Sequence, residues 1–478
     1  MTAPNTLDFS TFHNVINNQL TTTSETRHGI NPANTEPNPP VPVSTQDDLD
    51  KAVKAAQDAF KGWAKTSFEE RRKALHAWAD AIEANADGFA QTLTMEQGKP
   101  LTQASAEVGM AGTWIRGLAA IEIPENVIEE TEDRKIVQRY TPIGVVGAIV
   151  PWNFPVLLAV GKIASAIYTG NPIIVKPSPF TPYCGLKLVE LASKFLPPGV
   201  IQCLSGDESL GPLFTAHPGI EKISFTGSIT TGKRVMAACA ASLKRVTLEL
   251  GGNDPAIICD DVDIDAVIPK VGVLSYLCSS QICMMIKRLY VHEKIYDEFL
   301  EKLVAFVKTL KVGNGTEADT FFGPVQNQMQ YEKAKDLLSS IGTENLKTAL
   351  GGSIESSSGY YIHPTIIDNP PETSRVVQEE PFAPILPVMK WSDEDEVLER
   401  ANALDTGLGS SVWSKDFERA TRMADQLQSG IVWVNSHFDV APNAPFGGHK
   451  QSGMGVEWGL EGLLGYCNSQ TLWLKKTV

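Results

Sequence analysis

The chain has 478 residues, a formal charge of −15 at pH 7 and 42% hydrophobic side chains. This length exceeds what one hydrophobic core organises, so we expect a globular protein of two or three domains. The acidic balance, without clusters of Lys and Arg, argues against a nucleic-acid partner and against docking on an anionic membrane.

The N-terminal part of the chain predicts no targeting segment. Its first twenty residues lack the basic and apolar regions of a signal peptide, and no apolar run along the chain is long enough to span a bilayer. The C-terminal residues LKKTV match no retention or peroxisomal signal. We therefore expect a cytoplasmic protein that does not attach to a membrane.

Two helices are expected after a Pro- and Asn-rich extended segment at residues 31–43. Ser44 and Thr45 offer N-cap oxygens, and apolar residues then recur at helical spacing as far as Phe60. A second helix is expected from about Phe68.

The middle of the chain has the texture of an α/β protein. A polar, alternating stretch at residues 126–140 predicts an exposed hairpin whose edge pairs with another strand. From Gly144, short β-rich segments alternate with helical ones, which indicates a parallel sheet covered on both faces. These segments are residues 145–150, 172–176, 200–206, 222–227, 245–250 and 255–261. A second α/β region begins near Ile282.

Two segments at expected strand ends are suited to binding an anion or a sugar. GSITTGKR, residues 227–234, nearly matches a phosphate-binding loop, but Arg234 stands where a hydroxyl is required. A Gly-Ser turn into a helix still directs N–H groups at an anion, so a dinucleotide contact competes here with an ordinary turn. Lys176 in VKPS ends a strand, where it is either a ribose ligand or an ordinary surface lysine.

Three residues are candidates for chemistry. Glu249 lies in an apolar strand, as a general base or as half of a buried salt bridge. Asn153 in PWNFP either donates to an oxyanion or belongs to a proline-stiffened turn. Cys283 lies five residues after Cys278, and a nucleophilic cysteine needs a nearby base or donor to form thiolate. The seven cysteines form no CxxC pair, and no metal-ligand spacing is present.

Seven motifs resemble those of the aldehyde dehydrogenase superfamily, in order and spacing, across essentially the whole chain. They are PWNFP, VKPS, FTGSITTGK, LELGGNDP, SQIC, EEPFAP and PFGGHKQSG. The resemblance implies an α/β fold with a Rossmann-like coenzyme-binding domain, an α/β catalytic domain and a small β oligomerisation element, in a homodimer or homotetramer. The expected boundaries are 1–120 and 140–250 for the first, 251–448 for the second, and 121–139 with 460–478 for the third.

The resemblance also implies an NAD(P)-dependent oxidoreductase that converts a small-molecule aldehyde to a carboxylic acid. Cys283 resembles the nucleophile that forms a thiohemiacetal and then a thioester, Glu249 the general base that activates water, and Asn153 the oxyanion donor. Glu457 matches a second acid that relays protons. The implied cofactor-binding residues, with Lys176 at the adenine ribose and Glu380 at the nicotinamide ribose, are Trp152, Lys176, Ser178, Gly227, Ser228, Gly232, Glu380 and Phe382.

The residues that match the family's substrate pocket are mostly apolar. They are Phe154, Leu158, Gly161, Ile282, Met284, Phe438 and Val440. Gly161 stands where several relatives keep Trp, so we expect extra room there. The hypothesis is a bulky aliphatic or aromatic aldehyde from specialised metabolism.

Three departures from the family pattern leave alternatives open. Cys278 and Ser280 replace an Asn and a Gly, which restricts the backbone beside the nucleophile and suggests a catalytically impaired binding or scaffold protein as the alternative. Cys278 either forms a reversible disulfide with Cys283 or simply packs. Pro179 replaces a Glu of many NAD-using relatives without adding a cation, so we predict NAD over NADP but leave NADP open. A P-loop nucleotide hydrolase is the other rival, disfavoured by Arg234.

Overall fold

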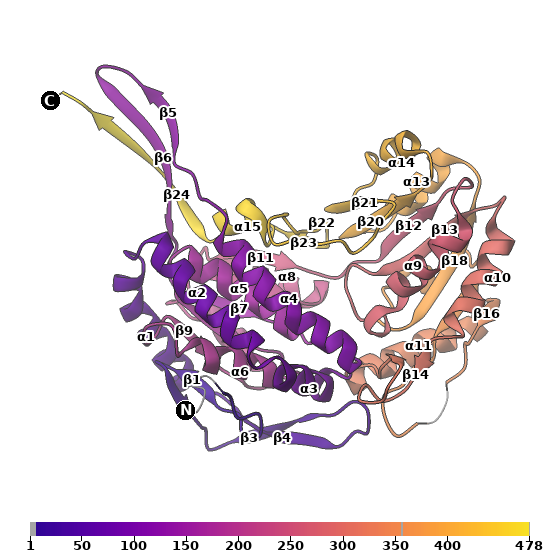
Figure 1. Cartoon of the computed structure of the whole chain (residues 1–478), viewed down its shortest axis with the longest axis horizontal. Coiled ribbons are helices and arrows are strands. Elements are labelled where there is room, and N and C mark those ends of the chain that lie inside the picture. Colours follow the sequence, from indigo (N-terminus) through magenta and orange to yellow (C-terminus); the bar gives the residue numbers. More distant parts are fainter. Residues whose placement is uncertain (1–5, 355–356, 478) are drawn as a thin grey trace.

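The computed structural model describes residues 6–354 and 357–477, and two α/β regions make up most of it (Figure 1). The first contains an eight-stranded sheet in the order β2-β1-β9-β8-β7-β10-β11-β23. The strands from β9 to β11 are parallel, whereas β1 runs antiparallel to β9 and β23 runs antiparallel to β11. The strands are β1 (Asn14–Ile16), β2 (Gln19–Thr21), β7 (Val146–Ile149), β8 (Ile173–Lys176), β9 (Ile201–Cys203), β10 (Lys222–Thr226), β11 (Arg245–Glu249) and β23 (Gly453–Met454).

Helices cover both faces of this sheet, as its continuous apolar strands predict. In β8, Ile173 and Val175 pack into the cluster formed by α2 to α6, whereas Ile174 packs with α1, α7 and α8 on the other face. The helices are α1 (Gln46–Trp63), α2 (Phe68–Glu83), α3 (Ala86–Gln97), α4 (Leu101–Ala119), α5 (Pro155–Tyr168), α6 (Tyr183–Ala192), α7 (Leu210–Ala216) and α8 (Ile229–Ala240).

The two predicted helix starts are confirmed. Thr45 caps α1 and forms a capping box with Asp48, and Ser67 does the same for α2 with Glu70. Ser44 has a different role: its hydroxyl donates to the Ser205 carbonyl at 2.6 Å.

The second region contains a seven-stranded sheet in the order β16-β17-β18-β13-β12-β20-β21, in which only β16 runs antiparallel to its neighbour among the described residues. The strands are β12 (Asp254–Ile258), β13 (Ile286–His292), β16 (Thr348–Leu350), β17 (Thr365–Asp368), β18 (Ile385–Trp391), β20 (Gly409–Trp413) and β21 (Ile431–Val434). The helices are α9 (Ile264–Tyr276), α10 (Tyr296–Val307), α11 (Gln328–Thr343), α12 (Arg375–Gln378), α13 (Glu394–Asn402) and α14 (Phe417–Ala424).

The segment 255–261, which follows the first run of strands in the sequence, therefore belongs to the second sheet as β12. Residues 250–253, which include Gly251 and Gly252, connect β11 of the first sheet to β12 of the second. Short elements complete the structure: β3 (Thr26–Ile30), β4 (Pro37–Pro42), β14 (Lys311–Val312), β15 (Thr320–Phe322), β19 (Thr406–Gly407), β22 (His449–Lys450), α15 (Gly459–Leu464) and a 3₁₀ turn (Leu277–Ser280).

A three-stranded sheet projects from the body of the molecule (Figure 1). It consists of β5 (Asn126–Glu130), β6 (Arg134–Pro142) and β24 (Cys467–Lys475), and β24 pairs with β6 along its whole length. The hairpin of β5 and β6 begins at Asn126, where the polar, alternating stretch predicted it. The predicted pairing of the hairpin edge is thus made within the chain, between segments more than 300 residues apart.

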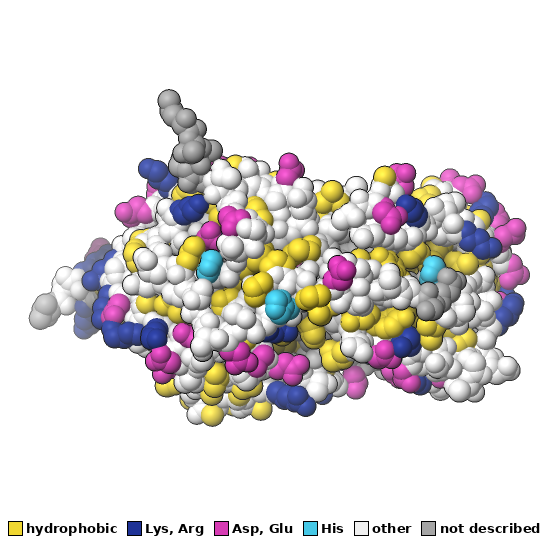
Figure 2. Space-filling model, turned by 90° about the horizontal axis from the view of Figure 1, so that it is seen from below, with side chains coloured by type: hydrophobic (Ala, Val, Ile, Leu, Met, Phe, Trp, Pro, Cys, Tyr) yellow, Lys and Arg dark blue, Asp and Glu magenta, His cyan; other side chains and the backbone are white. Residues whose placement is uncertain are grey.

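The surface has no single dominant charge on the face shown in Figure 2, where apolar side chains lie along the middle and acidic and basic ones surround them. Within residues 6–354 and 357–477, no helix is both long enough and apolar enough to cross a membrane.

Candidate active site

Cys283 lies half-buried in a loop that leads from the 3₁₀ turn into β13. Cys278, Ser279 and Ser280 all have positive φ, at 55°, 53° and 59°. Side chains with a Cβ adopt this conformation at a cost, so the surrounding structure has to hold the turn in place. The buried Lys287 ammonium does so by donating to the carbonyls of Ser280 at 2.9 Å and Ile282 at 2.6 Å.

Cys278 is buried at the start of this turn. Its N–H donates to Gln103 Oε1 at 3.0 Å, and its thiol lies 3.7 Å from Gln97 Oε1. Cys278 and Cys283 are both free thiols in the structure. These contacts fit the packing role predicted for Cys278, and a disulfide between Cys278 and Cys283 stays a hypothesis.

Asn153 lies beside the nucleophile loop, as the oxyanion role requires. Its side-chain Nδ2 donates to the carbonyl of Gln281 at 3.0 Å, two residues before Cys283. Its own carbonyl accepts from Lys99 Nζ at 2.9 Å, and Lys99 forms a fully buried ion pair with Glu107 at 2.5 Å. The loop is therefore fixed by a buried ion pair as well as by its prolines.

Glu107 has a second function at this loop. Its Oε1 accepts from the N–H groups of Val156 and Leu157, at 2.9 and 3.1 Å, in the first turn of α5. A carboxylate is favoured at a helix N-terminus, so the pair Lys99–Glu107 connects α4, α5 and the Asn153 loop. Neither residue was a candidate on sequence grounds, because nothing local marks them.

Glu249 is the last residue of β11 and is buried, with neither carboxylate oxygen hydrogen-bonded among the described residues. The buried salt bridge considered for it is therefore absent from the described part of the chain. Burial, and next the charge of Glu457, raise the pKa of Glu249 well above its usual value. A carboxylate that is kept dry and unpaired fits a group that takes a proton during turnover.

Glu249 and Cys283 lie within electrostatic reach of each other. Burial raises the pKa of the Cys283 thiol, and the Glu249 carboxylate adds to that shift. The backbone just after β11 is also close, since a Cβ on Gly252 would lie 2.6 Å from the Cys283 carbonyl oxygen. Glycine at this position lets the strand end approach the nucleophile loop.

Glu457 belongs to a buried polar network behind Glu249. Its Oε1 accepts from Lys162 Nζ at 2.9 Å and from the Ser224 hydroxyl at 2.5 Å. Burial opposes ionisation of Glu457, but Lys162 and Ser224 outweigh it and lower the pKa. Lys162 also acts on Glu249, where it partly opposes the rise in pKa caused by burial and by Glu457. The charges of Glu249, Glu457 and Lys162 therefore influence one another.

Glu380, expected at the nicotinamide ribose, is close enough to the nucleophile for its charge to act on Cys283. Glu380 is half-buried and its inaccessible Oε1 has no hydrogen-bond partner among the described residues; removal of the carboxylate from water raises its pKa to about 7. Phe382 has φ 49° and contacts the Trp152 ring edge-on, with centroids 5.3 Å apart. Gly251 faces Glu380, since a Cβ there would lie 2.6 Å from Glu380 Oε2.

The residues expected to hold the adenosine end lie at the carboxyl ends of β8 and β10. Lys176 is buried, and among the described residues its ammonium makes a single long hydrogen bond, 3.5 Å to the Pro177 carbonyl; burial lowers its pKa to about 8. Ser178 Oγ accepts from the Phe180 N–H at 3.2 Å. Ser228 caps α8 after Gly227, and Gly232 allows close packing because a Cβ there would lie 2.5 Å from Leu250.

The apolar pocket residues share one hydrophobic cluster with Cys283. This cluster contains Phe154, Leu158, Ile282, Met284, Phe438 and Val440. The extra room expected at Gly161 is wrong, because a Cβ there would lie 2.6 Å from Trp458 Nε1. The Trp458 ring occupies that space and contacts Trp114 and Phe446. These three aromatic residues were missed; the only sequence signal is that Trp458 directly follows Glu457.

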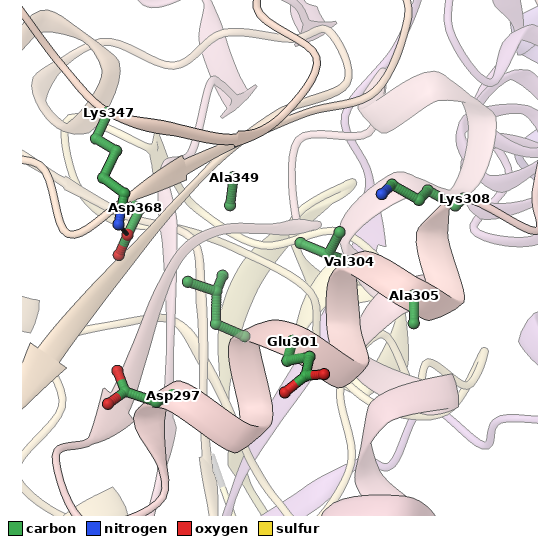
Figure 3. Close-up of a pocket in the computed structure, with 9 residues that line it drawn as sticks. Asp297, Glu301, Val304, Ala305, Lys308, Lys347, Ala349 and Asp368 are labelled. Atoms are coloured by element: carbon green, nitrogen blue, oxygen red, sulfur yellow. Dashed lines mark ion pairs between the residues drawn. The ribbon is translucent and has the colours of Figure 1, made fainter.

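Another concave area lies on the second region, between α10 and β16 (Figure 3). Val304 and Ala349 line it, and Lys347 reaches Asp368 in an ion pair of 2.6 Å. None of the candidate catalytic residues lies there. In the described ranges, no three His, Cys, Asp or Glu side chains are grouped to hold a metal ion.

Comparison with known proteins gives consistent matches. The aldehyde dehydrogenase family model matches residues 20–472. Aldehyde dehydrogenase LUC3 of Fusarium sp. is 41% identical, over 98% of this chain and 100% of the relative. Glutarate-semialdehyde dehydrogenase of Pseudomonas aeruginosa is 35% identical, over 93% of each. A crystal structure of betaine aldehyde dehydrogenase from Staphylococcus aureus in complex with NAD+ has a TM-score of 0.94 and 33% identity, with 98% of each chain covered.

Proposed function

The chain belongs to the aldehyde dehydrogenase family of NAD(P)-dependent oxidoreductases, and we propose that it oxidises an aldehyde to a carboxylic acid through a thioester on Cys283. The observation that carries this proposal is the buried Glu249, without a partner among the described residues, whose charge acts on a half-buried Cys283 in a loop held by Asn153 and Lys287. Dry carboxylates without partners are costly in a core that serves only packing.

The first step is attack of the Cys283 sulfur on the aldehyde carbon. The thiol passes its proton to a water molecule, a C–S bond forms between the sulfur and the aldehyde carbon, and the carbonyl oxygen becomes an oxyanion; the thiolate released at the end of the cycle takes up a proton again. Asn153 uses one amide hydrogen to hold the Gln281 carbonyl, which leaves the other for this oxyanion. The buried ammonium of Lys287 favours the thiolate. It lowers the pKa of Cys283 and so opposes the effects of burial and of the surrounding carboxylates.

The residues at strand ends fit a dinucleotide. The unpaired Glu380 oxygen and the under-coordinated Lys176 ammonium are groups that ribose hydroxyls would satisfy, and the N-terminus of α8 would face a pyrophosphate oxygen. When bound, NAD+ supplies the acceptor for the hydride that leaves the carbon attached to Cys283. The complex of betaine aldehyde dehydrogenase with NAD+ supports NAD+ as the cofactor.

Glu249 acts in the second half of the reaction. It takes a proton from a water molecule, the hydroxide attacks the thioester carbon, and the C–S bond breaks to release a carboxylic acid and the Cys283 thiolate. The Lys162–Glu457 ion pair acts on the charge of Glu249 from a buried position, and Glu457 is the group that the family resemblance implies as the proton relay for Glu249. The net change is one aldehyde, one water and one NAD+ to one acid, one NADH and one proton.

We propose a bulky aliphatic or aromatic aldehyde, an intermediate of specialised metabolism, because the cluster around Cys283 is apolar and aromatic. The protruding sheet β5-β6-β24 supports a homodimer or homotetramer, since Val127, Ile128, Trp473 and Leu474 expose apolar side chains on it. We also propose that the protein works in the cytoplasm, the location expected from its sequence.

The test is NADH formation across a panel of aldehydes, from acetaldehyde to benzaldehyde and long aliphatic aldehydes, with Cys283→Ser as control. The proposal expects NADH with at least one bulky aldehyde and none with the variant. The competing function, an impaired binding protein, is favoured by three successive strained residues before the nucleophile. Cofactor binding by calorimetry without NADH formation on any aldehyde would support that alternative.

A further inference from the structure

Arg27 lies beside the loop that follows β8, far from it in sequence. Its Nη1 donates to the carbonyl of Pro179. The two residues are separated by 152 positions, so this contact is a product of the fold. Pro179 is the position at which the sequence showed neither an acid nor a cation, and the structure brings a cation to it from the N-terminal segment.

The strand β3 holds Arg27 in place. Arg27 and Gly29 are two residues apart on β3 and share one face of it. Gly29 lies against Tyr183 at the start of α6: its N–H donates to the Tyr183 hydroxyl at 2.8 Å, and a Cβ there would lie 2.8 Å from that ring. The same hydroxyl donates to the Pro39 carbonyl at 2.7 Å, on strand β4. The base of the Arg27 side chain is therefore anchored.

Most of the guanidinium is free to bind a ligand. Within residues 6–354 and 357–477, the side chain of Arg27 makes only the hydrogen bond to Pro179, and it is half-buried. Arg27 and Lys176 are close enough for the Arg27 charge to act on the lysine. Two cations thus face one loop at the carboxyl end of a parallel strand, where a cofactor ribose binds.

The acidic groups nearby are Asp207 and Glu208, which act on Lys176, and Arg27 acts in turn on Asp207. The Asp207 carboxylate is already engaged by the Ser209 N–H at 2.8 Å and hydroxyl at 2.6 Å. No residue of the loop 177–180 is acidic. In dinucleotide sites an acid at the ribose selects the 2′-hydroxyl of NAD, whereas an arginine accommodates the 2′-phosphate of NADP.

We propose that Arg27 binds the 2′-phosphate of NADP+, so that this aldehyde dehydrogenase uses NADP+ as well as NAD+. The guanidinium offers paired N–H donors that match phosphate oxygens. The inference rests on the proposed function, because it assigns a second cofactor to the same site.

Calorimetric titration of 2′,5′-ADP and 5′-AMP tests the inference without turnover. The native protein should bind 2′,5′-ADP at least about tenfold more tightly than 5′-AMP, as one charge-assisted pair of hydrogen bonds gives. Arg27→Gln should remove most of this difference and leave 5′-AMP binding unchanged, and Arg27→Lys should keep part of it. Lys73→Gln, which removes an exposed cation from α2, should change neither.

A second variant guards against an effect of Arg27→Gln on folding. Asp207→Asn removes a negative charge from the same surroundings and should tighten 2′,5′-ADP binding severalfold. Equal affinity of the native protein for both nucleotides, or a preference that survives Arg27→Gln, would overturn the inference.

Kinetics separate this inference from the proposed function. The ratio of kcat/KM for NADP+ to that for NAD+ should fall about tenfold in Arg27→Gln. Turnover with NAD+ but no affinity for the 2′-phosphate would leave the proposed function standing and refute only the role of Arg27. No turnover with either cofactor would refute the function itself.

Discussion

The side-chain amide of Asn153 donates a 3.0 Å hydrogen bond to the carbonyl of Gln281, and so joins the loop before α5 to the loop that carries Cys283. The same amide group has a second hydrogen, which is available to donate to the substrate oxygen. One side chain thus both fixes the nucleophile loop and presents a donor beside it.

Replacing Asn153 with Ala should lower kcat by about 10²–10³, the usual cost of one oxyanion donor. Steady-state kinetics with a good aldehyde measure this loss. The rate at which iodoacetamide alkylates Cys283 should change far less than kcat, because the thiol remains. A variant that raises KM and leaves kcat unchanged would contradict the oxyanion role.

The raised pKa of Glu249 predicts a dependence of activity on pH. The carboxylate can accept a proton from water only when ionised, so thioester hydrolysis should increase as pH rises through this raised pKa. Glu249→Gln should remove that increase and most of the hydrolysis. Single-turnover rates of acid release between pH 6 and about 10 give the profile. A flat profile in the native protein would contradict the assignment.

The same shift has a consequence for stability. Because the folded-state pKa lies above that of the unfolded chain, the protonated form stabilises the fold below the unfolded pKa, and this contribution is lost as pH rises through the folded pKa. The melting temperature of Glu249→Gln should therefore fall less than that of the native protein between neutral and alkaline pH. Calorimetry at matched pH values checks this.

Ser280 predicts a stabilising substitution. Its φ of 59° suits glycine, so Ser280→Gly should increase the free energy of unfolding by about 1 kcal/mol, and Ser280→Ala, which keeps the Cβ, should not. Chemical denaturation measures both variants. Activity should be kept in Ser280→Gly, since Lys287 still holds the carbonyl of residue 280. Equal stability of the two variants would show that the turn is not strained.

The contact between Gly161 and Trp458 predicts a reciprocal pair of effects. Gly161→Ala introduces a Cβ at 2.6 Å from the indole nitrogen and should cost about 1–3 kcal/mol. Trp458→Ala should open that space and raise kcat/KM for larger aldehydes by about tenfold or more over small ones. Gly161→Ala should therefore cost little stability when it is added to Trp458→Ala, because the clashing ring is gone. Additive destabilisation would show that the two residues do not meet.

Much of the fold follows from local patterns. The Thr45 and Ser67 caps, and the buried strands between residues 145 and 250, depend on neighbouring residues in the sequence. The local pattern alone could not show to which sheet β12 belongs, because a buried parallel strand has the same apolar composition in either sheet; only the boundary at residue 251 implied by the family resemblance separated it from the first region. That choice depends on long-range contacts with β13 and β20.

The site shows the same division. Cys283, Glu249 and Asn153 lie in recognisable motifs. The Lys99–Glu107 pair, Arg27 beside Pro179 and Trp458 in the space next to Gly161 join residues from distant segments, and no local pattern marks them. Gly161 in particular suggested an opening because the side chain that fills it comes from 297 positions later in the chain.

The central claim is that Cys283 carries the acyl group and Glu249 removes it. The most direct measurement is mass spectrometry of the Glu249→Gln variant, acid-quenched after mixing with aldehyde and NAD+. We predict one acyl group per chain on the peptide that contains Cys283, formed together with a burst of NADH and absent in Cys283→Ser. A burst of NADH with no modified cysteine, or an acyl group on another residue, would contradict the account.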